Sequence, residues 1–159
     1  MFAALLGLVW YGFGQNVLAP AKPSGIPQYL GSLKIASQVE GTEAQTQINR
    51  LHGTSISLQN AFIVEYKAEY GGGYVQVWAG SAGSEAAAAD LINRMVNGIN
   101  RGGTGFTNLR QVKVASHDVW QADGKGGQFF FYISADRVVW LTIEGSDSAA
   151  LLESAVKVF

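Results

Sequence analysis

Residues 128–143 read QFFFYISADRVVWLTI, and this stretch decides the fold. Its two runs, Gln128–Ile133 and Arg137–Ile143, consist largely of aromatic and β-branched residues, which favour strands. Between them, Ala135-Asp136 marks a tight turn. The stretch therefore predicts two antiparallel strands, and with them a sheet that is mainly antiparallel.

Side chains alternate between the two faces of a strand, so the same stretch predicts two sets of residues. We expect the core face to carry Phe129, Phe131, Val139, Leu141 and Ile143. We expect the outer face to carry Phe130, Tyr132, Val138 and Trp140. An aromatic outer face of this size needs a cover, which is either another element of the chain or a partner. In the second case, Phe130, Tyr132 and Trp140 are the partner-facing residues.

Further strands are expected on both sides of this hairpin. Their composition and alternation predict strands at residues 33–39, 62–67, 74–79, 111–115 and 118–121. Helical spacing predicts a short helix from Gly41, with Ala44, Ile48 and Leu51 on its buried side. Two further helices are expected at residues 84–101 and 148–158.

A weak internal repeat links the two halves of the chain. Val77-Trp78 followed by Gly83-Ser84-Glu85 matches Val139-Trp140 followed by Gly145-Ser146-Asp147 at the same spacing. Each copy reads as a strand followed by a helix start with a capping hydroxyl and an acidic residue. The fold class is therefore α+β: about six to seven strands, with about three helices packed on one face.

Composition limits the function. The chain has 159 residues and a net charge of −1, and only 14% of its residues are charged. No Lys/Arg cluster is present to neutralise phosphates, so nucleic acid is not an expected partner. The absence of cysteine excludes disulfides, thiolate-held zinc and iron–sulfur clusters. A surface so poor in charge is suited to extensive contact with other proteins.

The N-terminal segment, residues 1–19, reads MFAALLGLVWYGFGQNVLA and contains no charge. As a helix it would be about 28 Å long, close to the thickness of a bilayer core. Ala3 and Gly7 form a small-residue pair that would allow another helix to approach closely. A single membrane span is the main interpretation, with a pilin-type filament helix and an uncleaved export signal as alternatives. Lipid or partner helices are therefore its expected contacts.

Residues 20–28 contain Pro20, Pro23 and Pro27, which stop the helix and form a short, stiff spacer. We expect residues 29–159 to form a single α+β domain, in which the weak repeat defines two halves.

The residues offer little catalytic chemistry. His52 is expected at the end of a helix, and His117 at a turn beside Asp118, whose side chain points to the opposite face. No spacing typical of a metal site, a phosphate loop or a nucleophile elbow is found. We therefore expect no enzyme activity, no cofactor and no metal.

The segment Leu51-His52-Gly53, continuing through Phe62 and Tyr66, resembles a family of single-pass, membrane-anchored α+β domains. The resemblance extends over most of the domain, through Trp78, Met95, Phe106 and the hairpin from Phe131 to Trp140. It implies a fold and a membrane anchor, and it implies no activity, cofactor or binding residue.

The expected function is that of a non-catalytic, membrane-anchored accessory or structural subunit in a larger assembly, with its domain on the extracytoplasmic side. Its expected partners are other subunits or copies of itself. One alternative is a pilin-like filament subunit. Another is a ligand-binding sensor, which a pocket lined by Tyr132, Trp140 and Trp78 would support.

Overall fold

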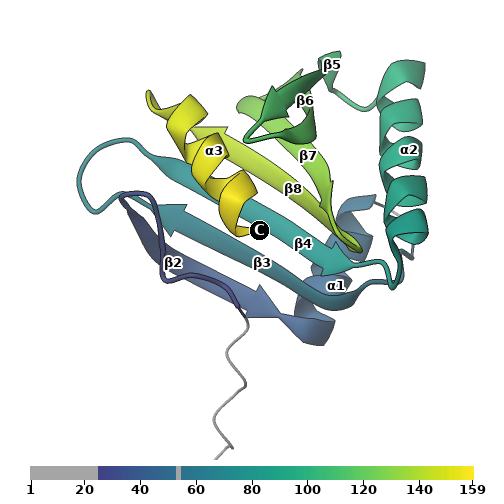
Figure 1. Cartoon of the computed structure of the whole chain (residues 1–159), viewed down its shortest axis with the longest axis horizontal. Helices are drawn as coiled ribbons and strands as arrows, with labels where there is room; N and C mark the ends of the chain where they lie inside the picture. Colours follow the sequence, from purple (N-terminus) through teal and green to yellow (C-terminus); the bar gives the residue numbers. More distant parts are fainter. Residues whose placement is uncertain (1–24, 53–54) are drawn as a thin grey trace, which may run out of the picture.

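The structure, a computed structural model, describes residues 25–52 and 55–159 (Figure 1). In chain order its elements are β1 (Tyr29–Leu30), β2 (Leu33–Glu40), α1 (Gly41–His52), β3 (Gln59–Lys67), β4 (Tyr74–Ser81), α2 (Glu85–Arg101), β5 (Thr107–Val114), β6 (His117–Gly124), β7 (Gly127–Ser134), β8 (Arg137–Glu144) and α3 (Ser148–Val158). The strands form one antiparallel sheet in the order β1-β2-β3-β4-β8-β7-β6-β5. The predicted α+β class is confirmed.

The sheet has eight strands, one more than the highest number expected. The additional strand is β1, a two-residue strand that pairs with Leu33 and Lys34 of β2. Two residues are too short to show an alternating pattern, so composition does not reveal this strand. Its Leu30 is buried in the core, and the Tyr66 hydroxyl donates a hydrogen bond of 2.8 Å to the Pro27 carbonyl. The folded domain therefore includes the end of the expected spacer.

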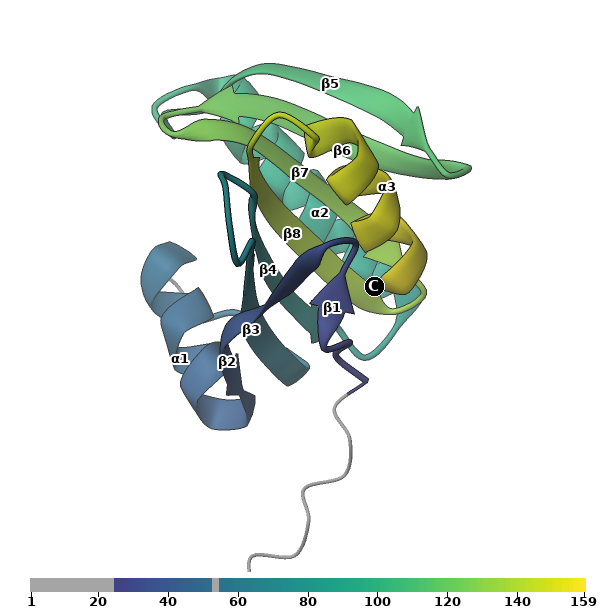
Figure 2. The same ribbon diagram turned by 90° about the vertical axis from the view of Figure 1, so that its left-hand side faces the viewer.

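The helices lie on both faces of the sheet, and the expectation that they share one face is wrong. Figure 2 shows α1 and α3 on opposite sides of the sheet, and α2 packs on the same face as α1. The physical reason is the composition of the central strands, which are apolar on both faces. In β3, for example, Phe62, Ile63 and Val64 are consecutive and all buried.

The larger core lies under α3. The buried side of this helix presents Leu151, Leu152, Ala155 and Val156, and Phe159 follows at its end. The Phe159 ring lies 5.8 Å from that of Phe62 and 6.4 Å from that of Tyr66. These contacts hold the C-terminus against the centre of the sheet, as Figure 1 shows.

The opposite face has two smaller cores. Ala44 and Ile48 of α1 pack on Ala61 and Ile63 of β3, with Trp78 at the margin. Leu51 was expected on the same side of the helix, but it is 64% exposed. Under α2, a separate set of apolar residues is centred on Ile92, Ile99 and Phe131. The two helices thus cover different strands, and β4 lies between them.

The internal repeat has a definite place in the sheet. Trp78 and Trp140 are directly paired across β4 and β8, the two central strands. The helix that follows each strand, however, packs on a different face. The caps differ as well, since the Ser84 hydroxyl accepts a hydrogen bond from the Ala87 amide whereas α3 begins after Asp147 without a side-chain cap. The correspondence therefore does not extend to the packing of the helices.

Within residues 25–52 and 55–159, no helix has the length and apolarity needed to cross a membrane. The apolar segment 1–19, with Ala3 and Gly7, lies outside the residues that the structure describes. Its membrane role therefore stays a prediction.

Candidate functional site

Two of the three residues expected to face a partner are in the interior. The turn pairs Ser134 with Arg137, so each odd-numbered residue of β7 opposes an even-numbered residue of β8. Phe130 and Tyr132 therefore share the face that α3 covers, where they are only 3% and 1% exposed. Their assignment to a partner-facing surface is wrong, because an element of the same chain covers them.

Trp140 lies on the other face, half-buried among aromatic rings. It stacks on Phe131, with ring centroids 5.1 Å apart, and meets Phe106 edge to face at 5.4 Å. Phe106 precedes β5, so this chain itself also supplies part of the cover over Trp140. A pocket shared by Tyr132, Trp140 and Trp78 is excluded by geometry, since Tyr132 lies on the opposite face from the two tryptophans.

The histidines have local partners. The Nδ1 atom of His52 lies 2.8 Å from the Ile48 carbonyl at the end of α1, as its expected position predicted. The Nδ1 atom of His117 lies 3.1 Å from the Ala115 carbonyl, and Asp118 pairs with Lys113 at 2.7 Å. In the described part of the chain, no three His, Asp or Glu side chains are arranged to hold a metal ion.

A row of polar and aromatic side chains follows β4, the strand that lies between α1 and α2. Tyr74, Gln76 and Trp78 alternate with the buried Val75 and Val77, so the three point to the face that bears α1 and α2. All three are half-buried. At 3.3–3.4 Å per residue, they span about 13 Å from Tyr74 to Trp78. We call these three residues the β4 track.

Glu65 of β3 organises the polar part of the track. Its carboxylate accepts hydrogen bonds from Tyr74 at 3.0 Å, Gln76 at 3.1 Å and Ser37 at 2.9 Å. The Lys67 ammonium is 3.7 Å from the same carboxylate and 5.6 Å from the centre of the Tyr74 ring. Because both Glu65 oxygens are engaged, this carboxylate fixes the positions of the side chains around it.

This network shifts two pKa values in opposite directions. Partial burial would by itself raise the pKa of Glu65, but the hydrogen bonds from Ser37, Tyr74 and Gln76 and the charge of Lys67 lower it below its ordinary value. Burial, the hydrogen bond to Glu65 and the negative charges of Glu65 and Glu144 raise the pKa of Tyr74 to about 12. Near neutral pH, Glu65 is therefore ionised and Tyr74 is protonated.

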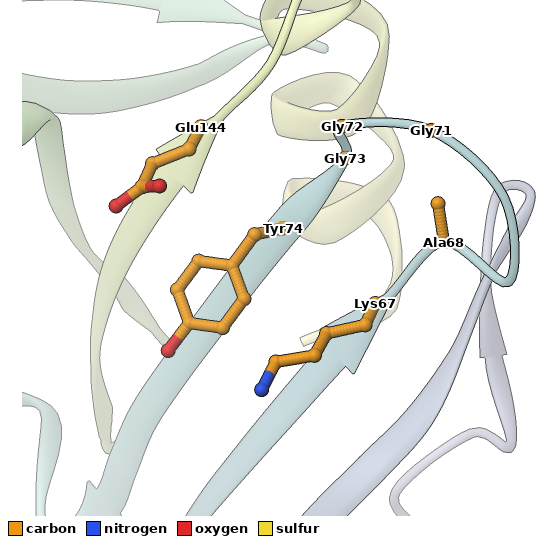
Figure 3. Close-up of a pocket in the computed structure, with 7 residues that line it drawn as sticks. All are labelled: Lys67, Ala68, Gly71, Gly72, Gly73, Tyr74 and Glu144. Carbon is orange, nitrogen blue, oxygen red and sulfur yellow. The ribbon is translucent and has the colours of Figure 1, made fainter.

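An open depression of about 440 Å³ lies at the Tyr74 end of the track. Figure 3 shows the side chains of Lys67, Tyr74 and Glu144 projecting to the same side of the sheet, with the Gly71–Gly73 loop beside them. The register explains this arrangement, since Tyr74 pairs directly with Lys67 on one side and Glu144 on the other. A phenol, an ammonium and a carboxylate therefore stand in one row across three strands.

A second open depression, of about 600 Å³, lies at the Trp78 end. Trp78 lines it together with one side of α1: Glu43, Thr46, Gln47, Arg50 and Leu51. These helix positions recur at intervals of three and four residues, so they form a single stripe. The track thus joins two hollows of mixed polar and apolar character, and its geometry suits the binding of an extended ligand.

The Glu65 network predicts a dependence of stability on pH. Its hydrogen bonds favour the ionised carboxylate, so Glu65 stabilises the fold at pH 7, and this contribution is lost as the pH falls from the unfolded-state pKa through the lower folded-state pKa. We expect the free energy of unfolding of Glu65→Gln to be lower than that of the wild type at pH 7, with the difference narrowing by about pH 3. Urea unfolding at both pH values measures this. Glu69→Gln, at an exposed loop residue, is the control. If the free energy of unfolding fell by the same amount between pH 7 and about pH 3 in the wild type and in Glu65→Gln, the role assigned to Glu65 would be contradicted.

The sequence does contain a signal for the track. Tyr74-Val75-Gln76-Val77-Trp78 alternates between polar or aromatic residues and valine, which is typical of a strand with one open face. The partnership with Glu65 depends on the register of β3 against β4, which places Glu65 directly opposite Gln76. That register is not visible in either strand alone.

Comparisons with protein-family models, with curated proteins and with solved structures find no match to this chain. The resemblance to a family of membrane-anchored α+β domains therefore stays a prediction.

Proposed function

We propose that the protein is a non-catalytic accessory subunit of a larger assembly. In this proposal the apolar segment 1–19 tethers it to a membrane, the domain lies on the extracytoplasmic side, and the β4 track is its binding surface. The observation that carries the proposal is the track itself, an open row of aromatic and hydrogen-bonding side chains in which Glu65 holds Tyr74 and Gln76 in place.

The protonation states in the track support binding rather than proton transfer. An efficient general acid or base has a pKa near the working pH. The pKa of Glu65 is lowered and that of Tyr74 is raised to about 12, so both are displaced away from neutrality. Tyr74 also donates a hydrogen bond to Glu65. Because this bond fixes both side chains, they are suited to positioning a ligand.

Other features of the chain support the tether and the assembly. The uncharged segment 1–19 has the length of a membrane span, and the prolines of residues 20–28 separate it from the domain. The low charge of the domain limits electrostatic repulsion between neighbouring subunits.

The lack of cysteine allows a direct test of the tether and of its orientation. Tyr70 is 88% exposed in the loop between β3 and β4, so a Tyr70→Cys variant carries a single accessible thiol. We expect a membrane-impermeant maleimide to label this variant in intact cells, in the membrane fraction. Labelling only after lysis would contradict an extracytoplasmic domain. Recovery of the label in the soluble fraction would contradict the tether.

The mass of the native complex tests the assembly. After extraction in a mild detergent, we expect a complex of fixed stoichiometry, larger than one chain in its micelle. Open-ended polymers would instead support the pilin-like alternative, and a monomer would contradict both.

A further inference from the structure

We propose that the ligand of the β4 track is an uncharged, linear polysaccharide, bound along the strand through side chains alone. This inference rests on the proposed binding role of the track and names its ligand class. Four properties of the site support it: its aromatic ends, its hydrogen-bonding centre, its mixture of both charge signs and its position in the middle of the sheet.

The two ends of the track are aromatic. Trp78 and Tyr74 are both half-buried, and each lines an open depression. A sugar ring has an apolar C–H face, which packs well on a flat, amphipathic aromatic side chain. Tyr74 and Trp78 are four residues apart, which is about 13 Å along the backbone of β4. A single sugar ring is shorter than this separation, whereas a chain of several rings can extend along it.

The centre of the track suits hydroxyl groups. The Gln76 amide has both donors and an acceptor, and it gives one N–H to Glu65. A sugar hydroxyl likewise both donates and accepts, so a fixed amide can pair with it in either direction. The hydrogen bond to Glu65 holds this amide in place before the ligand arrives, which reduces the entropic cost of binding.

The charges around the track nearly cancel, since two basic side chains face three acidic ones. Lys67 and Arg50 are basic, whereas Glu43, Glu65 and Glu144 are acidic. Such a surface neither attracts a polyanion such as nucleic acid nor favours a strongly cationic chain. The ligand that it suits is polar and uncharged.

The position of the track argues against an added peptide strand. Peptides that extend a sheet pair with the free backbone groups of an edge strand. From Tyr74 to Ser81, β4 is paired with β8, and on its other side it is paired with β3. Its backbone groups are therefore occupied, and a ligand on this strand makes contacts only with side chains.

The test measures oligosaccharide binding to the full chain in a polyoxyethylene detergent, because maltoside headgroups are themselves sugars. The probes are cellohexaose, chitohexaose and maltohexaose, each with its monosaccharide, and a polyglutamate and a heparin fragment as charged comparisons. Tryptophan fluorescence and calorimetry report binding. We expect at least one hexaose to bind saturably and its monosaccharide to bind at least about tenfold more weakly, since the monosaccharide reaches only one aromatic end.

Three variants locate the site. Trp78→Ala is expected to weaken hexaose binding by about tenfold, from the loss of one aromatic contact. Since Trp78 also borders the small core under α1, Gln76→Ala and Arg50→Ala provide surface substitutions that leave this core intact. We expect both to weaken binding. Lys113→Ala on β5, away from the track, is the matched control and should bind like the wild type.

The outcomes separate the ligand class from the proposed function. Any one of three results would overturn the proposal of a polysaccharide ligand. These are the absence of hexaose binding, a preference for a charged probe, and hexaose binding that the track variants leave unchanged. In those cases the maleimide labelling and the native mass still decide whether the chain is a tethered accessory subunit. Hexaose binding that depends on the track, in a chain that proves monomeric, would support the ligand and reject the assembly.

Discussion

Phe131→Ala is expected to lower the free energy of unfolding by about 3–5 kcal/mol, the range for a large aromatic residue removed from a core. Phe131 is fully buried, and its ring lies between two tryptophans. Its centroid is 5.1 Å from that of Trp140 on one side and 6.4 Å from that of Trp120 on the other. It also belongs to the apolar cluster under α2. The substitution therefore removes buried apolar area, opens a cavity and takes away the middle ring of the stack Trp120–Phe131–Trp140.

Urea unfolding followed by tryptophan fluorescence measures this change, and both tryptophans beside Phe131 report on it directly. Tyr70→Ala removes another aromatic ring, but from a side chain that is 88% exposed, so it should leave stability within about 0.5 kcal/mol of the wild type. Equal effects of the two substitutions would contradict the packing assigned to Phe131.

The sequence predicts most elements of the fold because their signals are local. The helix expected at residues 148–158 has the observed bounds, and the one expected at residues 84–101 has the observed cap at Ser84. Apolar residues recur at helical spacing in both, and Ser84 and Gly102 mark the two ends of α2. These signals do not depend on what the helix packs against.

The faces of the sheet could not be predicted because they depend on contacts between strands. Alternation tells which residues of β7 share a face, but the turn decides which residues of β8 join them. The two-residue turn brings Phe131 opposite Trp140, which reverses the expected assignment of β7 relative to β8. The position of α3 on the face opposite α1 and α2 likewise depends on how the strands pair.

The candidate site was missed for a related reason. Glu65 is one acidic residue among several in the sequence, and nothing local distinguishes it. Its role arises from three neighbours on two other strands: Ser37 of β2, and Tyr74 and Gln76 of β4. Spacing along the sequence reveals only groups of residues that are close in the chain, whereas this network forms across paired strands.

Gly145→Ala is expected to destabilise the domain by about 3 kcal/mol or more, through both backbone strain and collision. Gly145 joins β8 to α3 with a φ of +122°, a conformation that side-chain-bearing residues rarely adopt. A Cβ at this position would lie 2.5 Å from the Gly72 carbonyl oxygen and 3.3 Å from the Gly73 Cα. Those atoms belong to the loop beside Tyr74, so we also expect the substitution to weaken any ligand binding at that end of the β4 track.

Two other glycines separate the contributions of strain and collision. Gly83, the counterpart of Gly145 in the internal repeat, has a φ of +85°, but its Cβ would meet only the Gln59 amide at 3.8 Å. Gly83→Ala should therefore cost about 1 kcal/mol, from strain alone. Gly98 lies within α2 with open space around it, so Gly98→Ala should raise stability by about 0.5–1 kcal/mol. Thermal and urea unfolding of the three variants measure the order. If Gly145→Ala lowered the free energy of unfolding no more than Gly83→Ala does, this would contradict the close contact between Gly145 and the Gly71–Gly73 loop.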